Sequence, residues 1–93
     1  MRGLDSGSTV GAMKTTLYFD EQVTRKRPYI KRAWCEAALA GPVRRVAQSD
    51  GRIRHWLLIS DTPDGKPRML RVVTLPDGET VHNAFFDRDF PKG

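Results

Sequence analysis

The sequence predicts a single α+β domain, in which one or two N-terminal helices pack on a four-stranded antiparallel β-meander. Three observations lead to this fold class. Apolar residues show helix-type spacing over residues 30–38, β-favouring runs fill residues 43–86, and Asp-Gly pairs separate those runs. A chain of 93 residues suffices for one domain with a modest core, so we expect the fold to occupy residues 14–90.

The first 13 residues are rich in Gly and Ser and show no hydrophobic periodicity. This composition is typical of disorder, so we expect residues 1–13 to form a tail outside the domain. The longest apolar runs are far shorter than the ~20 residues needed to cross a bilayer, and no apolar signal-peptide core is found. We therefore expect a cytoplasmic protein without a membrane partner.

Two helices are expected before residue 41, and β-favouring residues at 14–19 are compatible with a short leading strand. Asp20 suits the N-cap of a first helix over residues 21–27, which Pro28 ends. Pro28 also suits the first turn of a second helix, which should run to Ala40 before Gly41. The second helix carries one apolar stripe that should face the sheet: Ile30, Ala33, Trp34, Ala37 and Ala38.

The first hairpin joins residues 43–49 to residues 52–60. Asp50-Gly51 predicts a two-residue turn, because Gly tolerates the positive φ that such turns require. A turn of that length would place Arg45 and Arg54 on the same face of the sheet.

The last hairpin, residues 69–86, is predicted around Pro76-Asp77-Gly78, after a longer connection over residues 61–68. With Leu75 opposite Glu79, Arg71 would pair with Asn83 on one face. On the other face His82 would lie among threonines.

The charge pattern favours an anionic partner. The formal net charge is +5, and residues 14–50 hold eight Lys and Arg against four Asp and Glu, a net +4. We expect this half to meet RNA, DNA or an acidic protein, although a plain solvated face would give the same pattern. The partner-binding candidates are Arg25, Lys26, Arg27, Tyr29, Lys31, Arg32 and Arg45, and Arg44 extends the patch.

Candidate catalytic residues come from the strands. The imidazole of His82 suits proton transfer near neutral pH, although the residue could equally be a half-exposed strand residue without a catalytic role. His55 is a weaker candidate. Arg71 either binds phosphate or forms a structural ion pair with Asp87 or Glu79. The lone Cys35 reads as a packing residue, and without a Cys/His cluster we expect no metal and no cofactor.

The segments 27–36, 50–56 and 71–88 together resemble a family of small bacterial proteins known mainly as a domain of unknown function. The resemblance covers residues 17–90, and the family is thought to be distantly related to RelE/BrnT-like toxins of toxin–antitoxin-like cassettes. It implies a ribonuclease-type α+β fold and a metal-independent endoribonuclease. The histidine often found early in related sequences has no counterpart in residues 20–27.

Two functions therefore remain open at the level of sequence. In the endoribonuclease, His82 would be the acid or base and Arg71 and Arg54 would bind phosphate, with a small acidic antitoxin-like protein encoded nearby as partner. In the alternative, a non-catalytic module binds an acidic protein or nucleic acid through the basic patch. The two differ in whether RNA is cleaved or only bound.

Overall fold

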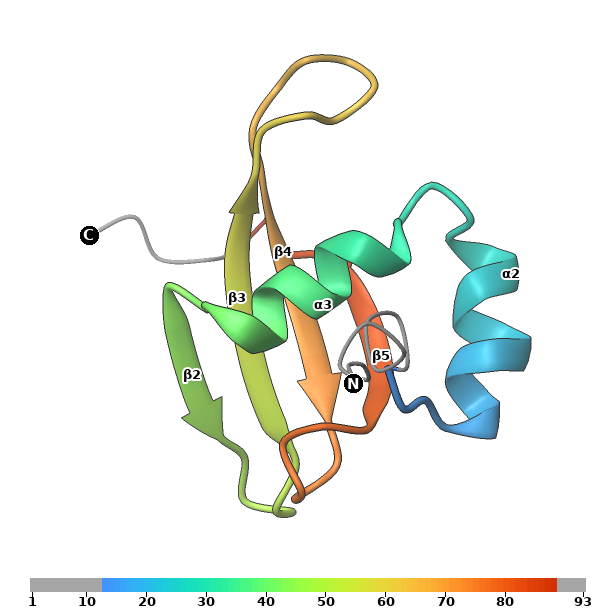
Figure 1. The fold of residues 1–93 in the computed structure, drawn as a ribbon, viewed down its shortest axis with the longest axis vertical. Helices are drawn as coiled ribbons and strands as arrows, with labels where there is room; N and C mark the ends of the chain where they lie inside the picture. Colours follow the sequence, from blue (N-terminus) through green and yellow to red (C-terminus); the bar gives the residue numbers. More distant parts are fainter. Residues whose placement is uncertain (1–12, 89–93) are drawn as a thin grey trace, which may run out of the picture.

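The strands form one antiparallel sheet in the order β2-β3-β4-β5, so each pairs with its neighbour in sequence (Figure 1). The computed structural model describes residues 13–88. Its elements are η1 (Phe19–Val23), α2 (Thr24–Lys26), α3 (Arg32–Ala40), β2 (Arg44–Ala47), β3 (Ile53–Ile59), β4 (Arg68–Thr74) and β5 (Val81–Phe86). The predicted α+β meander is thereby confirmed. The expected tail lies outside the described residues, except for Met13, which packs against the core.

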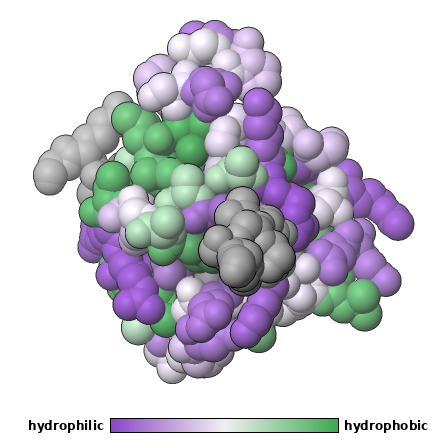
Figure 2. Space-filling view, in the orientation of Figure 1, coloured by the Kyte–Doolittle hydropathy of each residue, from purple (hydrophilic) through white to green (hydrophobic). Residues whose placement is uncertain are grey.

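The core lies between the helices and one face of the sheet. Trp34, Cys35 and Ala38 of α3 contact the inward-facing residues of the strands, among them Leu70 and Val72, which are fully buried. Figure 1 shows α3 crossing the sheet and the η1–α2 segment standing beside β5. The helix side is mostly hydrophilic outside, with apolar surface gathered over α3 and the loop toward β2 (Figure 2). The opposite face of the sheet carries none of the described helices.

The helices differ in detail from the predicted ones. Helical structure begins at Leu17 and includes a π-helical turn, and Thr16 rather than Asp20 provides the cap, because its Oγ1 accepts the Phe19 N–H at 3.1 Å. Residues 28–30 form a turn, so the second helix begins at Arg32 instead of Pro28. Its buried side is Trp34, Cys35 and Ala38, whereas Ala33 and Ala37 of the expected stripe are exposed. The expected leading strand is reduced to one parallel bridge between Thr15 and Val81.

The first turn is one residue longer than predicted. The Gly51 N–H donates to the Gln48 carbonyl and Gly51 has φ +93°, which is the three-residue loop of a type I turn followed by a left-handed residue. Arg45 consequently pairs with His55, and Val46 pairs with Arg54. Arg45 and Arg54 therefore lie on opposite faces, and the prediction that they share a face was wrong.

The last hairpin turns where predicted, but its register differs. Asp77 accepts hydrogen bonds from the side chain and N–H of Thr80 and the N–H of Glu79, which lower its pKa to about 2 and fix the turn. Leu75 pairs with Thr80 instead of Glu79. A bulge follows, so that Val73 pairs with Asn83.

This register shift moves particular side chains. Arg71 lies opposite Phe85 rather than Asn83, although all three remain on the face away from the helices. The predicted register would pair Val81 with Val73 on the face of Arg71, but Val81 pairs with Thr74 and lies in the core. His82 falls within the bulge, between the Val73–Asn83 and Thr74–Val81 pairs, so it is not opposite Val72. Among residues 13–88, no helix is long and apolar enough to span a bilayer.

Candidate functional site

Arginines and aromatic rings alternate across the sheet face that lies opposite the helices. The Arg44 guanidinium carbon lies 5.6 Å from the Trp56 ring centroid, and that of Arg71 lies 5.7 Å from the same centroid. Arg71 also lies 4.6 Å from the Phe85 centroid, and Arg27 lies 5.7 Å from it. We call these five residues the arginine–aromatic row. It crosses β2, β3, β4 and β5 and ends on Arg27, which follows α2.

Asp87 fixes the centre of the row. Its Oδ2 accepts the Trp56 indole N–H at 2.9 Å and lies 3.1 Å from Nη2 of Arg71. The Asp87 side chain is 7% exposed and that of Arg71 is 21% exposed, so this ion pair is shielded from water. Of the roles considered for Arg71, the structural pair with Asp87 is therefore formed, and the guanidinium is held in place over Phe85.

The other cation expected on this face also has a defined position. Arg54 lies beside the row and its Nε donates to Oε1 of Gln48 at 2.7 Å. Arg45 is on the opposite face, where its Nη2 approaches Gly78. The sheet thus brings Arg44, Arg54 and Arg71 to one face and excludes Arg45 from it.

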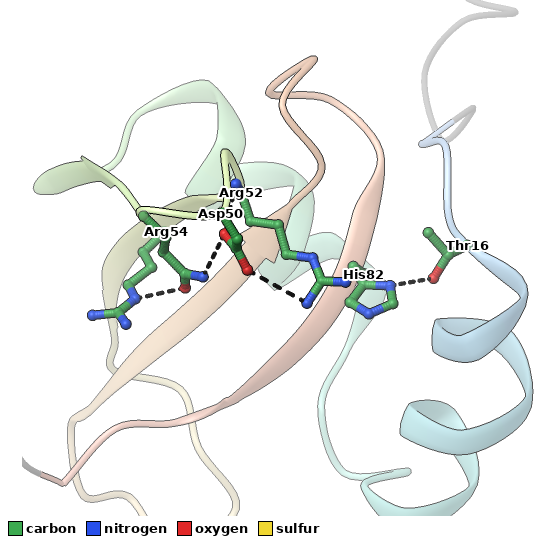
Figure 3. Close-up of polar contacts among 6 residues, drawn as sticks. Thr16, Asp50, Arg52, Arg54 and His82 are labelled. Carbon is green, nitrogen blue, oxygen red and sulfur yellow. Dashed lines mark hydrogen bonds and ion pairs between the residues drawn. The ribbon is translucent and has the colours of Figure 1, made fainter.

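His82 lies away from Arg71 and Arg54 and has its own partners. Its Nδ1 is 3.0 Å from Thr16 Oγ1, and its ring stacks on Tyr18 with centroids 4.8 Å apart. Figure 3 shows Arg52 extending toward the His82 ring while Arg54 points away from it. The three residues expected to form one catalytic site are therefore not brought together.

Arg52 is the cation beside His82, and residue order alone did not indicate this. Partial burial, and then the positive charge of Arg52, lower the pKa of His82, so its imidazole is neutral at pH 7. Arg52 is itself oriented by Asp50, whose Oδ2 lies 3.9 Å from Nη1. A neutral imidazole next to a guanidinium has the composition of an acid–base and phosphate-binding pair.

The basic cluster expected around Tyr29 is spread over several surfaces. Arg25 and Lys26 are exposed on α2, and Lys31 lies over the Trp34 ring at 5.4 Å. Arg32 donates to the Met13 carbonyl at 3.4 Å. Only Arg27 reaches the arginine–aromatic row.

Arg27 and Tyr29 do meet in a cleft at the β5 end of the row. The cleft has a volume of about 530 Å³. It is lined in part by Arg27, Tyr29, Asp64, Arg68, Phe85 and Arg88. A second hollow of about 300 Å³ shares Arg68 and Arg88 with the cleft and is bordered by Asp87. The row, the hollow and the cleft are therefore neighbouring parts of one surface.

His55 and Cys35 are enclosed in the protein. His55 is 2% exposed, its Nε2 contacts Thr74 Oγ1 at 3.0 Å, and its Nδ1 has no hydrogen-bond partner among residues 13–88. Burial, and then the charge of Arg45, lower its pKa. Cys35 is fully buried, which raises the pKa of its thiol to about 11. Neither side chain is placed to meet a substrate, and the packing role expected for Cys35 is confirmed.

The site predicted from the sequence lacked four residues: the ring partners Trp56 and Phe85 and the cleft residues Arg68 and Arg88. The alternation of Arg54 and Trp56, one strand away from Arg71, was the available signal. Within residues 13–88, no three His, Cys, Asp or Glu side chains gather where they could hold a metal ion. Comparison with family models, curated proteins and solved structures finds no match to this chain.

Proposed function

We propose that this protein binds single-stranded nucleic acid, RNA in particular, across the sheet face that carries the arginine–aromatic row. The observation that supports the proposal is that Arg44, Arg54 and Arg27 lie along one face of the sheet, while the Asp87 ion pair fixes Arg71 between them. A strand of nucleic acid presents regularly spaced phosphates, to which guanidinium groups donate paired hydrogen bonds.

The rings in the row position the cations more than they contact bases. Trp56 is 6% exposed, with arginines beside it from the strands on either side. Its faces are therefore taken, and the guanidinium edges are what a ligand meets first. Such a surface binds through the backbone of the nucleic acid and reads little sequence.

Salt dependence of binding tests this proposal. We expect a fluorescently labelled RNA of about ten nucleotides to bind with an affinity that falls steeply with salt, and Arg44→Ser and Arg54→Ser each to reduce the slope of log K against log salt by about 0.7. Fluorescence anisotropy gives both quantities. Lys14→Ser is the matched control, because this exposed lysine pairs with Glu79 at 3.7 Å and does not belong to the arginine–aromatic row. Binding that is insensitive to both arginine variants would exclude the open face.

A second candidate is metal-independent RNA cleavage of the RelE/BrnT type, and the pairing of His82 with Arg52 favours it. In this site Thr16 holds Nδ1 of the ring, so Nε2 is the atom available for proton transfer, and Arg52 would stabilise the phosphorane charge. In this scheme Arg71 and Arg54, which the sequence predicted to bind phosphate at the catalytic site, are part of the RNA-binding face instead.

Cleavage is tested by incubating RNA with the protein in EDTA. Loss of product in His82→Gln and Arg52→Ala, with product retained in Lys14→Ser, would support the His82 site. If the RNA stays intact with the unchanged protein and with every variant, the cleavage proposal is excluded and only the binding proposal remains. An acidic antitoxin-like partner would compete with RNA for the open face. If bacteria that express this protein without the neighbouring gene grow normally, that result would count against a toxin.

A further inference from the structure

We propose that the cleft beside β5 is a pocket for one nucleotide of the bound strand, with its phosphate at Arg27 and Arg88 and its base on the Tyr29 ring. This inference rests on the proposed function and adds to it the substrate unit that the cleft accepts. The cleft continues the binding face, because Arg27 and Phe85 belong both to the arginine–aromatic row and to the lining. A strand that crosses the sheet toward β5 reaches the cleft without leaving the positively charged surface.

The size of the cleft suits one nucleotide. Its volume of about 530 Å³ lies within the roughly 300–1,000 Å³ that small-molecule sites occupy. Trp56, at the centre of the row, lines neither this cleft nor the smaller hollow. A nucleotide would therefore leave the line of the strand and enter the cleft at this end.

The charges of the lining suit a phosphate. Asp64 accepts hydrogen bonds from the side chains of Thr62 and Arg68 and from the Lys66 N–H, so it is already satisfied within its own loop. No described residue forms an ion pair with Arg27 or Arg88. Two guanidinium groups thus remain for an incoming anion.

Tyr29 supplies the platform for the base. Its ring is 51% exposed and stacks on Phe86 with centroids 6.0 Å apart and planes at 15°. Phe86 holds the orientation of the ring while half of its surface stays open. Stacking on such a ring tolerates every base.

The polar groups of the lining do not read the edge of a base. The Thr62 hydroxyl is engaged with Asp64 and with the Lys66 carbonyl. We therefore expect AMP, GMP, CMP and UMP to bind with affinities that differ by less than about tenfold, in the order of their stacking strength. An acidic peptide would use the arginines but would gain little from the exposed tyrosine.

Isothermal titration calorimetry with the full chain tests the pocket. AMP, adenosine and inorganic phosphate are the three probes, and we expect AMP to bind most tightly. Tyr29→Ala and Arg88→Ser should each weaken AMP binding about tenfold, and Tyr29→Phe should not, because the ring rather than its hydroxyl is needed. Lys14→Ser removes one exposed positive charge away from the cleft and serves as control. Both altered side chains are exposed, so circular dichroism should show folded variants.

Several outcomes would overturn the pocket. AMP that binds no more tightly than phosphate, or that is unaffected by Tyr29→Ala while Arg88→Ser weakens it, would make the cleft a simple anion site. If RNA binds the open face but AMP does not bind, the nucleotide pocket is excluded and the proposed function is unaffected. If AMP binding depends on Tyr29 and Arg88 but RNA does not bind, the nucleotide pocket is supported and the binding of an RNA strand across the open face is excluded.

Discussion

Asp87→Asn isolates the ion pair that organises the arginine–aromatic row. The asparagine oxygen can keep the 2.9 Å bond to the Trp56 indole, so the variant removes mainly the charge that faces Arg71 at 3.1 Å. Hydrogen bonds between charged groups contribute about 1.5–3 kcal/mol, whereas neutral ones contribute about 1 kcal/mol. Because Arg71 keeps some solvent contact, at 21% exposure, we expect a loss of about 2 kcal/mol, below the 3–5 kcal/mol of a fully buried pair.

The loss is measured by urea and thermal unfolding, followed by tryptophan fluorescence and circular dichroism. For a domain of this size about 2 kcal/mol corresponds to a fall in Tm of roughly 8–16 °C. A double-mutant cycle with Arg71→Met should give a coupling free energy above about 1 kcal/mol. Glu79→Gln breaks the exposed Lys14–Glu79 pair and should change stability by less than about 0.5 kcal/mol. A loss in Asp87→Asn as small as that of the control would refute the reasoning.

Three further predictions concern stability and reactivity. Gly78→Ala should cost about 1 kcal/mol, because φ at this residue is +71°, whereas Gly41→Ala, with φ −147° and no atom within 4 Å of the new Cβ, should be neutral or stabilising; equal effects in urea melts would contradict this. The unfolding free energy should fall as the pH drops below about 6.5, since the pKa values of His55 and His82 are lowered in the folded state and the unfolded chain takes up the protons first. His55→Gln should flatten that dependence by a slope of up to about 1.4 kcal/mol per pH unit, and an unchanged profile would assign the effect to other groups. Cys35 should react with a thiol reagent only as the chain unfolds, because burial raises its pKa to about 11; rapid labelling of the folded protein would show that the core opens locally.

Local signals in the sequence were sufficient for the order and type of the strands. Each run of the expected meander is bounded by Gly or Pro, and each of its four strands appears with its ends within two residues of the predicted ones. Cys35 and Trp34 were expected in the core and lie there. The helix that follows Pro28 was placed too early, because the turn at residues 28–30 packs Ile30 against the core without a helix.

The register of the hairpins depended on details that residue preferences do not encode. Asp-Gly is compatible with a loop of two or three residues, and at Gly51 the longer loop formed and reversed the face of Arg45. At the last hairpin, Asp77 accepts hydrogen bonds from Thr80, which lengthens the loop, and the bulge at His82 then restores the faces of Arg71 and Phe85. One residue of difference in a turn is enough to exchange the neighbours of every side chain beyond it.

The sequence by itself determined that this protein is an α+β domain with a meander, because period, turn residues and helix stops act over a few residues. Only the tertiary structure decided which cations gather and which do not. Arg71 meets Asp87 and Phe85 because strand pairing joins β4 to β5, and Arg52 approaches His82 across the sheet. Arg27 and Arg88 line one cleft although they are far apart in the chain. These contacts follow from the pairing of the strands and from the position of the segment after α2 beside β5, and both depend on residues that are far apart in the chain.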